Sequence, residues 1–139
     1  GVRPVSDAVR IPRTIVNEIL RHAQHAEGEE VCGLIAGKGG AFTRCYPVTN
    51  VAPDRQHLFQ MDPKGQIDAM RAMRAAGEEL MAIYHSHPDA PAAPSPTDIA
   101  QDEYPGVLQL IVSLSTKGVL EMRGYLIRDR RVTEVAIGI

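Results

Sequence analysis

Hydrophobic and polar positions recur with two different periods along the chain, and each change of period marks a predicted element. Apolar residues at helical spacing, with charged residues between them, predict helices over residues 13–26 and 64–76. Gly28 and Gly77 follow these helices as stop signals, and Asp62-Pro63 is typical of a helix start. Short apolar runs bounded by turn residues predict strands over residues 30–36, 41–48, 58–61, 80–84, 107–114, 119–127 and 131–137.

The order of these elements predicts one mixed α/β domain of the α+β-like kind. The continuous apolar run at 80–84 is typical of a central strand that is covered on both faces. The last three strands form a meander, with turns predicted at 116–118 and at Asp129-Arg130. We expect a single domain over residues 9–139 and a flexible segment over residues 1–8.

Composition narrows the class of protein. The chain has 139 residues, of which 44% are hydrophobic and 23% are charged, as in an ordinary globular domain. A net charge of −2 and only 4% aromatic residues argue against a nucleic-acid partner. No apolar stretch is long enough to cross a membrane, and no secretory signal begins the chain. Two cysteines, Cys32 and Cys45, predict buried thiols in a reduced, cytoplasmic setting.

His85 and His87 are the sharpest chemical feature of the sequence. They follow the predicted central strand directly, and side chains at i and i+2 of an extended chain point to the same face. Two imidazoles on one face can share a metal ion, and we expect them to face an open mouth. Taken alone, such a pair is more often a coincidence or two surface histidines than a metal site. We expect His22, His25 and His57 to be exposed to solvent.

The segment Ser95-Pro96-Thr97-Asp98 is typical of a helix start, with Ser95 as N-cap and an acid three residues later. Capping and function are compatible, because Asp98 in the first turn could also turn its carboxylate towards a metal. Two histidines and one aspartate are the three ligands that leave a fourth zinc position open, although Fe(II) accepts the same set.

Metal-assisted hydrolysis also needs a base that takes the proton of the attacking water. Glu29 and Glu30 both precede the apolar strand. We expect Glu29 to be solvated. A carboxylate beside Val31-Cys32-Gly33-Leu34, such as that of Glu30, would be partly buried, which raises the pKa of a carboxyl group; the alternative is that Glu30 also lies at the solvated end of a turn.

Together these residues resemble the JAMM (MPN+) metalloprotease family. The family pattern is a glutamate in an E-x-C-G-L strand, then H-x-H, seven residues, and S-x-x-D. Here Glu30-Val31-Cys32-Gly33-Leu34 matches the first part, and His85-Ser86-His87 is followed by seven residues and then by Ser95-Pro96-Thr97-Asp98. The resemblance covers about residues 9–137. It departs from the pattern at Gly28, where proline is frequent.

The resemblance implies a three-layer fold with a central mixed sheet flanked by helices, similar in shape to cytidine deaminases. It further implies that Glu30 is the general base, that His85, His87 and Asp98 bind Zn²⁺, and that Ser95 steadies the water or the oxyanion of the tetrahedral intermediate. Deaminase chemistry is disfavoured, because the H-x-E and P-C-x-x-C signatures are absent.

By analogy with compact bacterial members of the family, we expect cleavage of a peptide or isopeptide bond after the C-terminal Gly-Gly of a ubiquitin-like or sulfur-carrier protein. The alternative is a non-catalytic MPN scaffold that binds a partner protein. The sequence indicates neither the oligomeric state nor the roles of loops 50–57 and 89–93.

Overall fold

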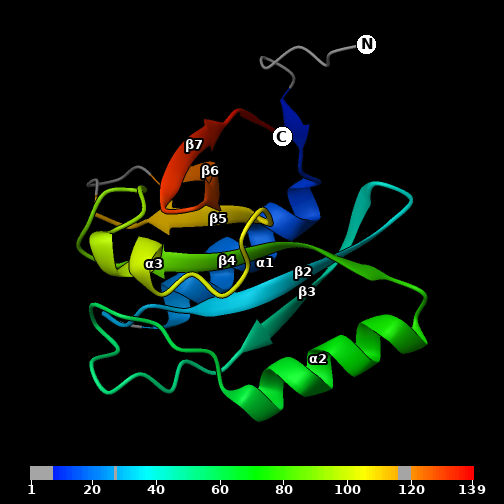
Figure 1. Ribbon diagram of the computed structural model, residues 1–139, viewed down its shortest axis with the longest axis horizontal. Coiled ribbons are helices and arrows are strands. Elements are labelled where there is room, and N and C mark those ends of the chain that lie inside the picture. Colours follow the sequence, from blue (N-terminus) through cyan, green and yellow to red (C-terminus); the bar gives the residue numbers. More distant parts are fainter. Residues whose placement is uncertain (1–7, 27, 116–119) are drawn as a thin grey trace.

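The computed structural model describes residues 8–26, 28–115 and 120–139, and its core is a six-stranded mixed sheet (Figure 1). Only the central pair of strands is parallel, and all other neighbours are antiparallel. A small second sheet pairs the two ends of the domain in parallel, β1 (Val9–Arg10) with β8 (Ile137–Gly138). The order of the large sheet is β3 (Ala41–Val48), β2 (Cys32–Lys38), β4 (Glu79–His87), β5 (Leu108–Ser113), β6 (Glu121–Arg128) and β7 (Arg131–Val135).

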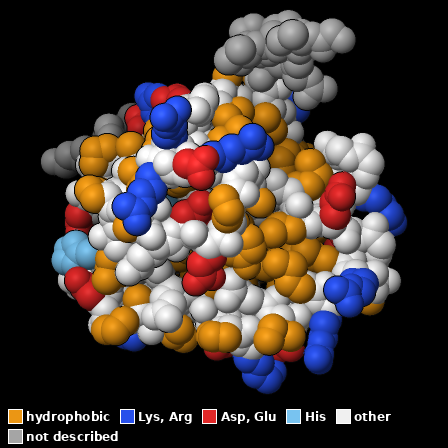
Figure 2. Space-filling view, in the orientation of Figure 1, with side chains coloured by type: hydrophobic (Ala, Val, Ile, Leu, Met, Phe, Trp, Pro, Cys, Tyr) orange, Lys and Arg blue, Asp and Glu red, His pale blue; other side chains and the backbone are white. Residues whose placement is uncertain are grey.

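Helices cover both faces of the sheet and produce three layers, as expected. Helix α1 (Arg13–His25) packs its apolar side on one face, in a core cluster that includes Ile19, Ile35 and Leu110. Helix α2 (Pro63–Ala75) covers part of the other face, where Met73 joins a cluster with Leu34 and Ile83. Hydrophobic side chains remain visible beside α2 in the space-filling view (Figure 2).

The predicted start and stop residues of α2 have the expected conformations and contacts. The Asp62 carboxylate accepts a hydrogen bond from the Gly65 amide, which caps α2 at its N-terminus. Beyond the last turn, Gly77 has a φ of 70°, the left-handed conformation that lets the chain leave the helix and enter β4. Asp129 and Arg130 also have positive φ values, which confirms the tight turn between β6 and β7.

The structure contradicts the strand predicted at residues 58–61 and differs from the prediction in two other places. Residues 58–61 form no strand, and only an isolated bridge joins Met61 to Asn50. The Asn50 side chain instead holds this loop, donating to the Leu58 carbonyl and accepting from the Gln60 amide. The strand predicted at 80–84 extends through His87, and the pairing of β1 with β8 was not predicted. The turn expected at 116–118 lies outside the described residues, as does most of the segment expected to be flexible.

Tyr84 of β4 connects α1 to the sheet through its contacts with His22 and Gly33. A Cβ at Gly33 would overlap the ring of Tyr84 on the neighbouring strand, so only glycine fits beside this tyrosine. The Tyr84 hydroxyl lies 2.8 Å from Nδ1 of His22. The expectation that His22 is solvated is therefore wrong, because this imidazole is half-buried and burial lowers its pKa. His25 and His57 are exposed, as expected.

Candidate metal centre

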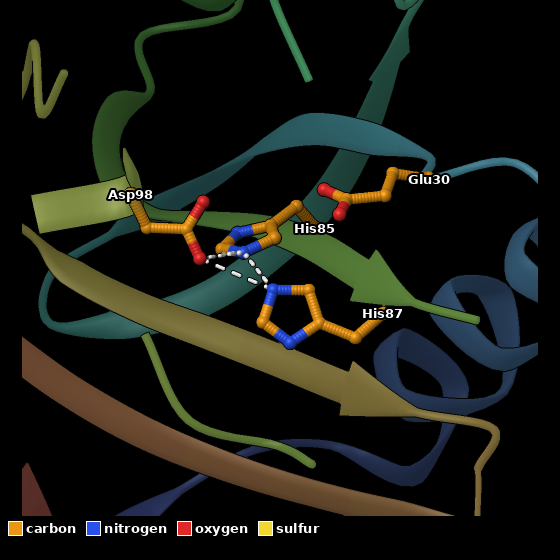
Figure 3. Close-up of side chains that lie close together, drawn as sticks. All are labelled: Glu30, His85, His87 and Asp98. Carbon is orange, nitrogen blue, oxygen red and sulfur yellow. Dashed lines mark hydrogen bonds and ion pairs between the residues drawn. The ribbon is translucent and has the colours of Figure 1, made fainter. Parts of the chain in front are cut away.

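Strand β4 carries His85 and His87 on the same face at its C-terminal end. Their Nε2 atoms are 3.1 Å apart, and their ring centroids are 4.9 Å apart (Figure 3). The expectation that the two rings face an open mouth is wrong, since His85 is 0% and His87 is 3% exposed. Both belong to a strand that is hydrogen-bonded to β5, and β2 extends the pairing to His85 on the other side. The central strands therefore fix the backbone of the two imidazoles.

The N-terminus of α3 (Pro96–Ala100) brings Asp98 to the two imidazoles. The Ser95 hydroxyl accepts from the Asp98 amide at 3.0 Å, and Asp98 Oδ2 accepts from the Ser95 amide at 2.9 Å, a complete capping box. The same Oδ2 lies 3.1 Å from Nε2 of both His85 and His87. Capping therefore aims one carboxylate oxygen of Asp98 at both rings.

Glu30 completes the cluster from the residue that precedes Val31 and β2. One ligand atom from each of Glu30, His85, His87 and Asp98 lies within 4.8 Å of the others. The Glu30 side chain points towards the rings in the close-up, and the residue is only 4% exposed (Figure 3). Its backbone is held on both sides, because its amide donates to the Arg55 carbonyl and its carbonyl accepts from the Asn50 side chain. Oε1 of Glu30 has no hydrogen-bond partner among the described residues.

Ser86, between the two histidines, links their strand to Glu30, and sequence reasoning missed this role. Its hydroxyl accepts from the Val31 amide at 2.9 Å, and its own amide donates to the Val31 carbonyl at 3.0 Å. The residue is completely buried. A small hydroxyl residue between two predicted ligands was the available signal, because it must point away from the face that the histidines share.

Phe59 and Pro91 fix the orientations of the rings, and sequence reasoning missed both contacts. The Phe59 ring stacks on His85 at a centroid distance of 4.3 Å. Nδ1 of His87 lies 2.8 Å from the Pro91 carbonyl, which can only accept. His87 therefore carries a proton on Nδ1, and Nε2 faces the cluster, where it donates to Asp98 when protonated and can bind a metal ion when it is not.

The charges of the cluster are coupled. Burial raises the pKa of Glu30 to about 8, in agreement with the expected direction. Burial lowers the pKa of His85, whereas contacts with Asp98 and Pro91 outweigh burial at His87 and raise its pKa. Burial also disfavours charge on Asp98, but the hydrogen bonds with His85 and His87 hold its pKa well below the ordinary value. A carboxylate is thus held next to a second, protonated carboxyl group.

These four residues fit a metal ion. The three closest acceptor atoms form a triangle with edges of 3.1 Å, near the ~3.3 Å that separates tetrahedral ligands about 2.0 Å from a zinc ion. Lone pairs that converge in a buried place repel one another unless a cation or a proton lies between them. Cys32 does not compete as a ligand, since burial raises the pKa of its thiol to about 12.

The structure thus brings together Glu30, His85, His87 and Asp98 and leaves Ser95 at the edge of the group. Ser95 is half-buried, and its hydroxyl has one acceptor position engaged by the helix cap. Glu29 is exposed and pairs with Arg55 at 3.3 Å, as expected of a solvated residue. Among the described residues, His22, His25 and His57 lie outside the cluster.

The fold and this buried cluster define a JAB/MPN-type domain, and comparison with known proteins shows the same family. Residues 12–128 match the model of the prokaryotic homologs of the JAB domain, and the chain belongs to this family. It is 37% identical over 103 residues to the desampylase of Haloferax volcanii, covering 70% of this chain and 74% of the relative.

Two further proteins show the extent of the similarity. The CysO-cysteine peptidase of Mycobacterium tuberculosis is 34% identical over 127 residues, covering 90% of this chain and 86% of the relative. The solution structure of a protein from Desulfitobacterium hafniense superposes with a TM-score of 0.83 at 33% identity, covering 93% of this chain and 90% of the other. The predicted family and mixed α/β fold are therefore confirmed. Among the described residues, no helix combines the length and apolar character that a membrane span needs.

Proposed function

We propose that this protein is a zinc-dependent hydrolase that cleaves a peptide or isopeptide bond after the C-terminal Gly-Gly of a ubiquitin-like or sulfur-carrier protein. The observation that carries the proposal is the convergence of Glu30, His85, His87 and Asp98 within 4.8 Å in a buried place. Its relatives support the substrate class, since one is named a desampylase and another a CysO-cysteine peptidase. Two free, buried cysteines fit a reduced, cytoplasmic setting.

In this proposal, His85, His87 and Asp98 hold the metal. Two imidazoles and one carboxylate without a thiolate favour Zn²⁺, and the same set also suits Fe(II). A bound zinc ion supplies Lewis-acid polarisation of the scissile carbonyl and makes water more acidic. The rigid strand and the helix cap hold the three ligands in place before the metal binds.

Glu30 is proposed as the general base. Its Oε1, which has no partner among the described residues, takes the proton of the attacking water and later returns it to the leaving nitrogen. Burial favours the protonated form of this carboxyl group, and a nearby cation favours the carboxylate. The base is therefore active only when a metal ion occupies the site.

Ser95 is proposed to stabilise the oxyanion. Its hydroxyl oxygen accepts from the Asp98 amide, so the hydroxyl proton remains available to donate to the developing charge. The cap holds the oxygen in one position, which makes the donor preorganised.

The test is incubation of the zinc-loaded protein with a carrier protein whose C-terminal Gly-Gly is joined either to a lysine side chain or to a single amino acid. We expect mass spectrometry to detect a carrier that ends in Gly-Gly and the free amine. Removal of zinc by a chelator should abolish the reaction, and readdition of zinc should restore it.

The non-catalytic scaffold makes the opposite prediction. If the zinc-loaded protein binds the carrier but cleaves neither conjugate, the proposed hydrolase is wrong and the scaffold is favoured. The Glu30→Gln variant is the matched control, because it retains the three ligands and lacks only the base.

A further inference from the structure

A cavity of about 330 Å³ opens beside Asp98. Thr97 and Asp98 of α3, Phe59 of the loop between β3 and α2, and Ile83 of β4 contribute to its wall. Glu30 does not line it and belongs to a different hollow. In the close-up, Asp98 and Glu30 lie on opposite sides of His85 (Figure 3). The cavity therefore adjoins the metal centre on the side away from the proposed base.

The wall of this cavity is apolar in one part and acidic in another. Leu58, Phe59 and Met61 supply apolar surface, whereas Asp102 and Glu103 supply carboxylates. None of the described residues that line it is lysine, arginine or histidine. A negative, partly apolar wall of this kind favours a long side chain with an aliphatic stem and a positive end.

Buried hydrogen bonds build the acidic part. Gln109 is 2% exposed and donates from Nε2 to Oδ1 of Asp102 at 2.8 Å, and the Tyr104 amide donates to the same oxygen at 3.0 Å. Gln66 in turn donates to the Tyr104 hydroxyl at 2.7 Å. No described residue donates to Oε1 of Gln109, so this buried side chain retains a free acceptor at the cavity. Asp102 is thus held in place by two donors, and none of the ion pairs found among the described residues includes it.

The hollow on the other side has a different character. Arg55 and His22 line it together with Glu29 and Glu30. Arg55 pairs with Glu29 at 3.3 Å, so a cation already neutralises one of the two carboxyl groups there. A basic side chain would find less attraction at this end than beside Asp102 and Glu103.

We propose that the cavity beside Asp98 binds a lysine or arginine side chain of the carrier, at one of the three positions that precede its Gly-Gly. This inference rests on the proposed function. Glu30 returns the proton to the leaving nitrogen, so the leaving group lies on the Glu30 side and the carrier extends towards Asp98. Glycine has no side chain, so the first side chain that can enter the cavity belongs to a residue upstream of Gly-Gly. Its stem packs on Leu58 and Phe59, and its charged end reaches Asp102 and Glu103.

Binding of short fluorescent peptides to the zinc-loaded Glu30→Gln variant tests the inference without turnover. The peptides end in Gly-Gly and carry lysine, norleucine or glutamate at one of the three preceding positions, with alanine at the other two. We expect lysine to bind about threefold to tenfold more tightly than norleucine at one position, and glutamate to bind most weakly. Fluorescence anisotropy gives the dissociation constants.

Glu103→Gln, added to this variant, should reduce the preference for lysine at least threefold. Glu103 is exposed, so its replacement leaves the fold intact, and Glu103→Lys should make glutamate the preferred residue. Glu79→Gln is the matched control, since Glu79 is also exposed and lies at the opposite end of β4 from the histidines. Asp102→Asn tests the same preference for lysine at the other carboxylate of the cavity wall.

Equal binding of lysine and norleucine peptides at all three positions would overturn the inference. Equal effects of Glu103→Gln and Glu79→Gln would also overturn it, because the preference would then come from net charge. The proposed function fails separately: it falls if the zinc-loaded wild type cleaves no conjugate, whatever the peptides show.

Discussion

The four residues of the metal centre are held in two different ways. His85 and His87 belong to β4, which is paired to β5 beside both and to β2 at His85. Glu30 and Asp98 lie at the edges of elements, one before β2 and the other in the first turn of a five-residue helix. The hydroxyl groups of Ser86 and Ser95 hold these edge positions by accepting hydrogen bonds from the amides of Val31 and Asp98.

The difference separates two requirements of the proposed reaction. Ligands that are fixed by a sheet keep their geometry without a metal, which favours tight and selective binding. A general base must reach first the attacking water and then the leaving group. A residue at the end of a helix or strand can make these small movements more readily than a residue in the middle of a strand. Loss of His85 or His87 should therefore remove the metal, whereas loss of Glu30, an edge residue that is not a ligand, should remove activity and leave the metal.

His87→Ala should have the largest effect. Removal of one of the three ligands leaves Asp98 and His85 to hold the ion alone, and we expect metal binding to weaken about 100-fold or more. Metal content by mass spectrometry and hydrolysis of a carrier conjugate should both fall to background. His25→Ala is the control, since this exposed histidine lies outside the cluster. A His87→Ala protein that retains both metal and activity would contradict the ligand assignment.

Glu30→Gln should abolish most of the activity and keep the metal. The amide is of similar size but cannot take the proton of water, so we expect kcat to fall about 10²- to 10⁴-fold. Zinc content should stay close to that of the wild type. The adjacent Glu29→Gln is a matched control, because Glu29 is exposed and should change kcat less than twofold. Normal turnover of Glu30→Gln would remove Glu30 from its proposed role.

Ser86→Ala should have an intermediate effect. It leaves the Val31 amide without its side-chain acceptor, at a cost of about 1–3 kcal/mol in stability, and loosens the backbone next to Glu30. We expect kcat to fall about tenfold with KM and zinc content nearly unchanged.

Ser86→Thr should restore activity, because it keeps the hydroxyl. Ser113→Ala is the control, since Ser113 is also a buried strand serine whose hydroxyl donates to a backbone carbonyl, that of Ala90. Equal losses of kcat in Ser86→Ala and Ser113→Ala would show a general loss of stability and contradict a positioning role.

The smallest effect concerns the pH dependence of stability in the metal-free protein. The pKa of Glu30 is about 8 in the folded chain, against an ordinary value of 4.5. Between these values the folded state keeps a proton that the unfolded state releases, so stability falls as pH rises. Metal-free wild type should lose about 1.5 kcal/mol between pH 6.5 and 8 relative to Glu30→Gln, as measured by urea denaturation. Parallel stability profiles for the two proteins would contradict the burial of a protonated Glu30.

Local patterns predicted most of the fold and the members of the cluster. Periodicity located α1 and α2, and spacing selected Glu30, His85, His87 and Asp98, which the structure brings together. Ser95 was predicted as a cap and is one, and its role in catalysis stays a prediction. These features depend on residues that are close in sequence or on motifs of fixed spacing.

The parts that could not be predicted depend on contacts between distant residues. Ser86 and Val31 are 55 positions apart, and Phe59 meets His85 only because the loop after Asn50 folds over the end of β4. The pairing of β1 with β8 joins the two ends of the domain. Residues 58–61 have the composition of a strand, but they form only one isolated bridge, and the Asn50 side chain takes the Leu58 carbonyl and the Gln60 amide.

The helix cap at Ser95 restricts which residues evolution can use at this position. Serine, aspartate and asparagine cap helices about equally well, so a purely structural cap would exchange among them freely. The oxyanion role proposed for Ser95 needs an oxygen that accepts from the Asp98 amide and also donates its own proton; asparagine would donate only from a separate nitrogen, and an added carboxylate would repel Asp98. Threonine is the remaining substitute, so active relatives should carry only serine or threonine at this position.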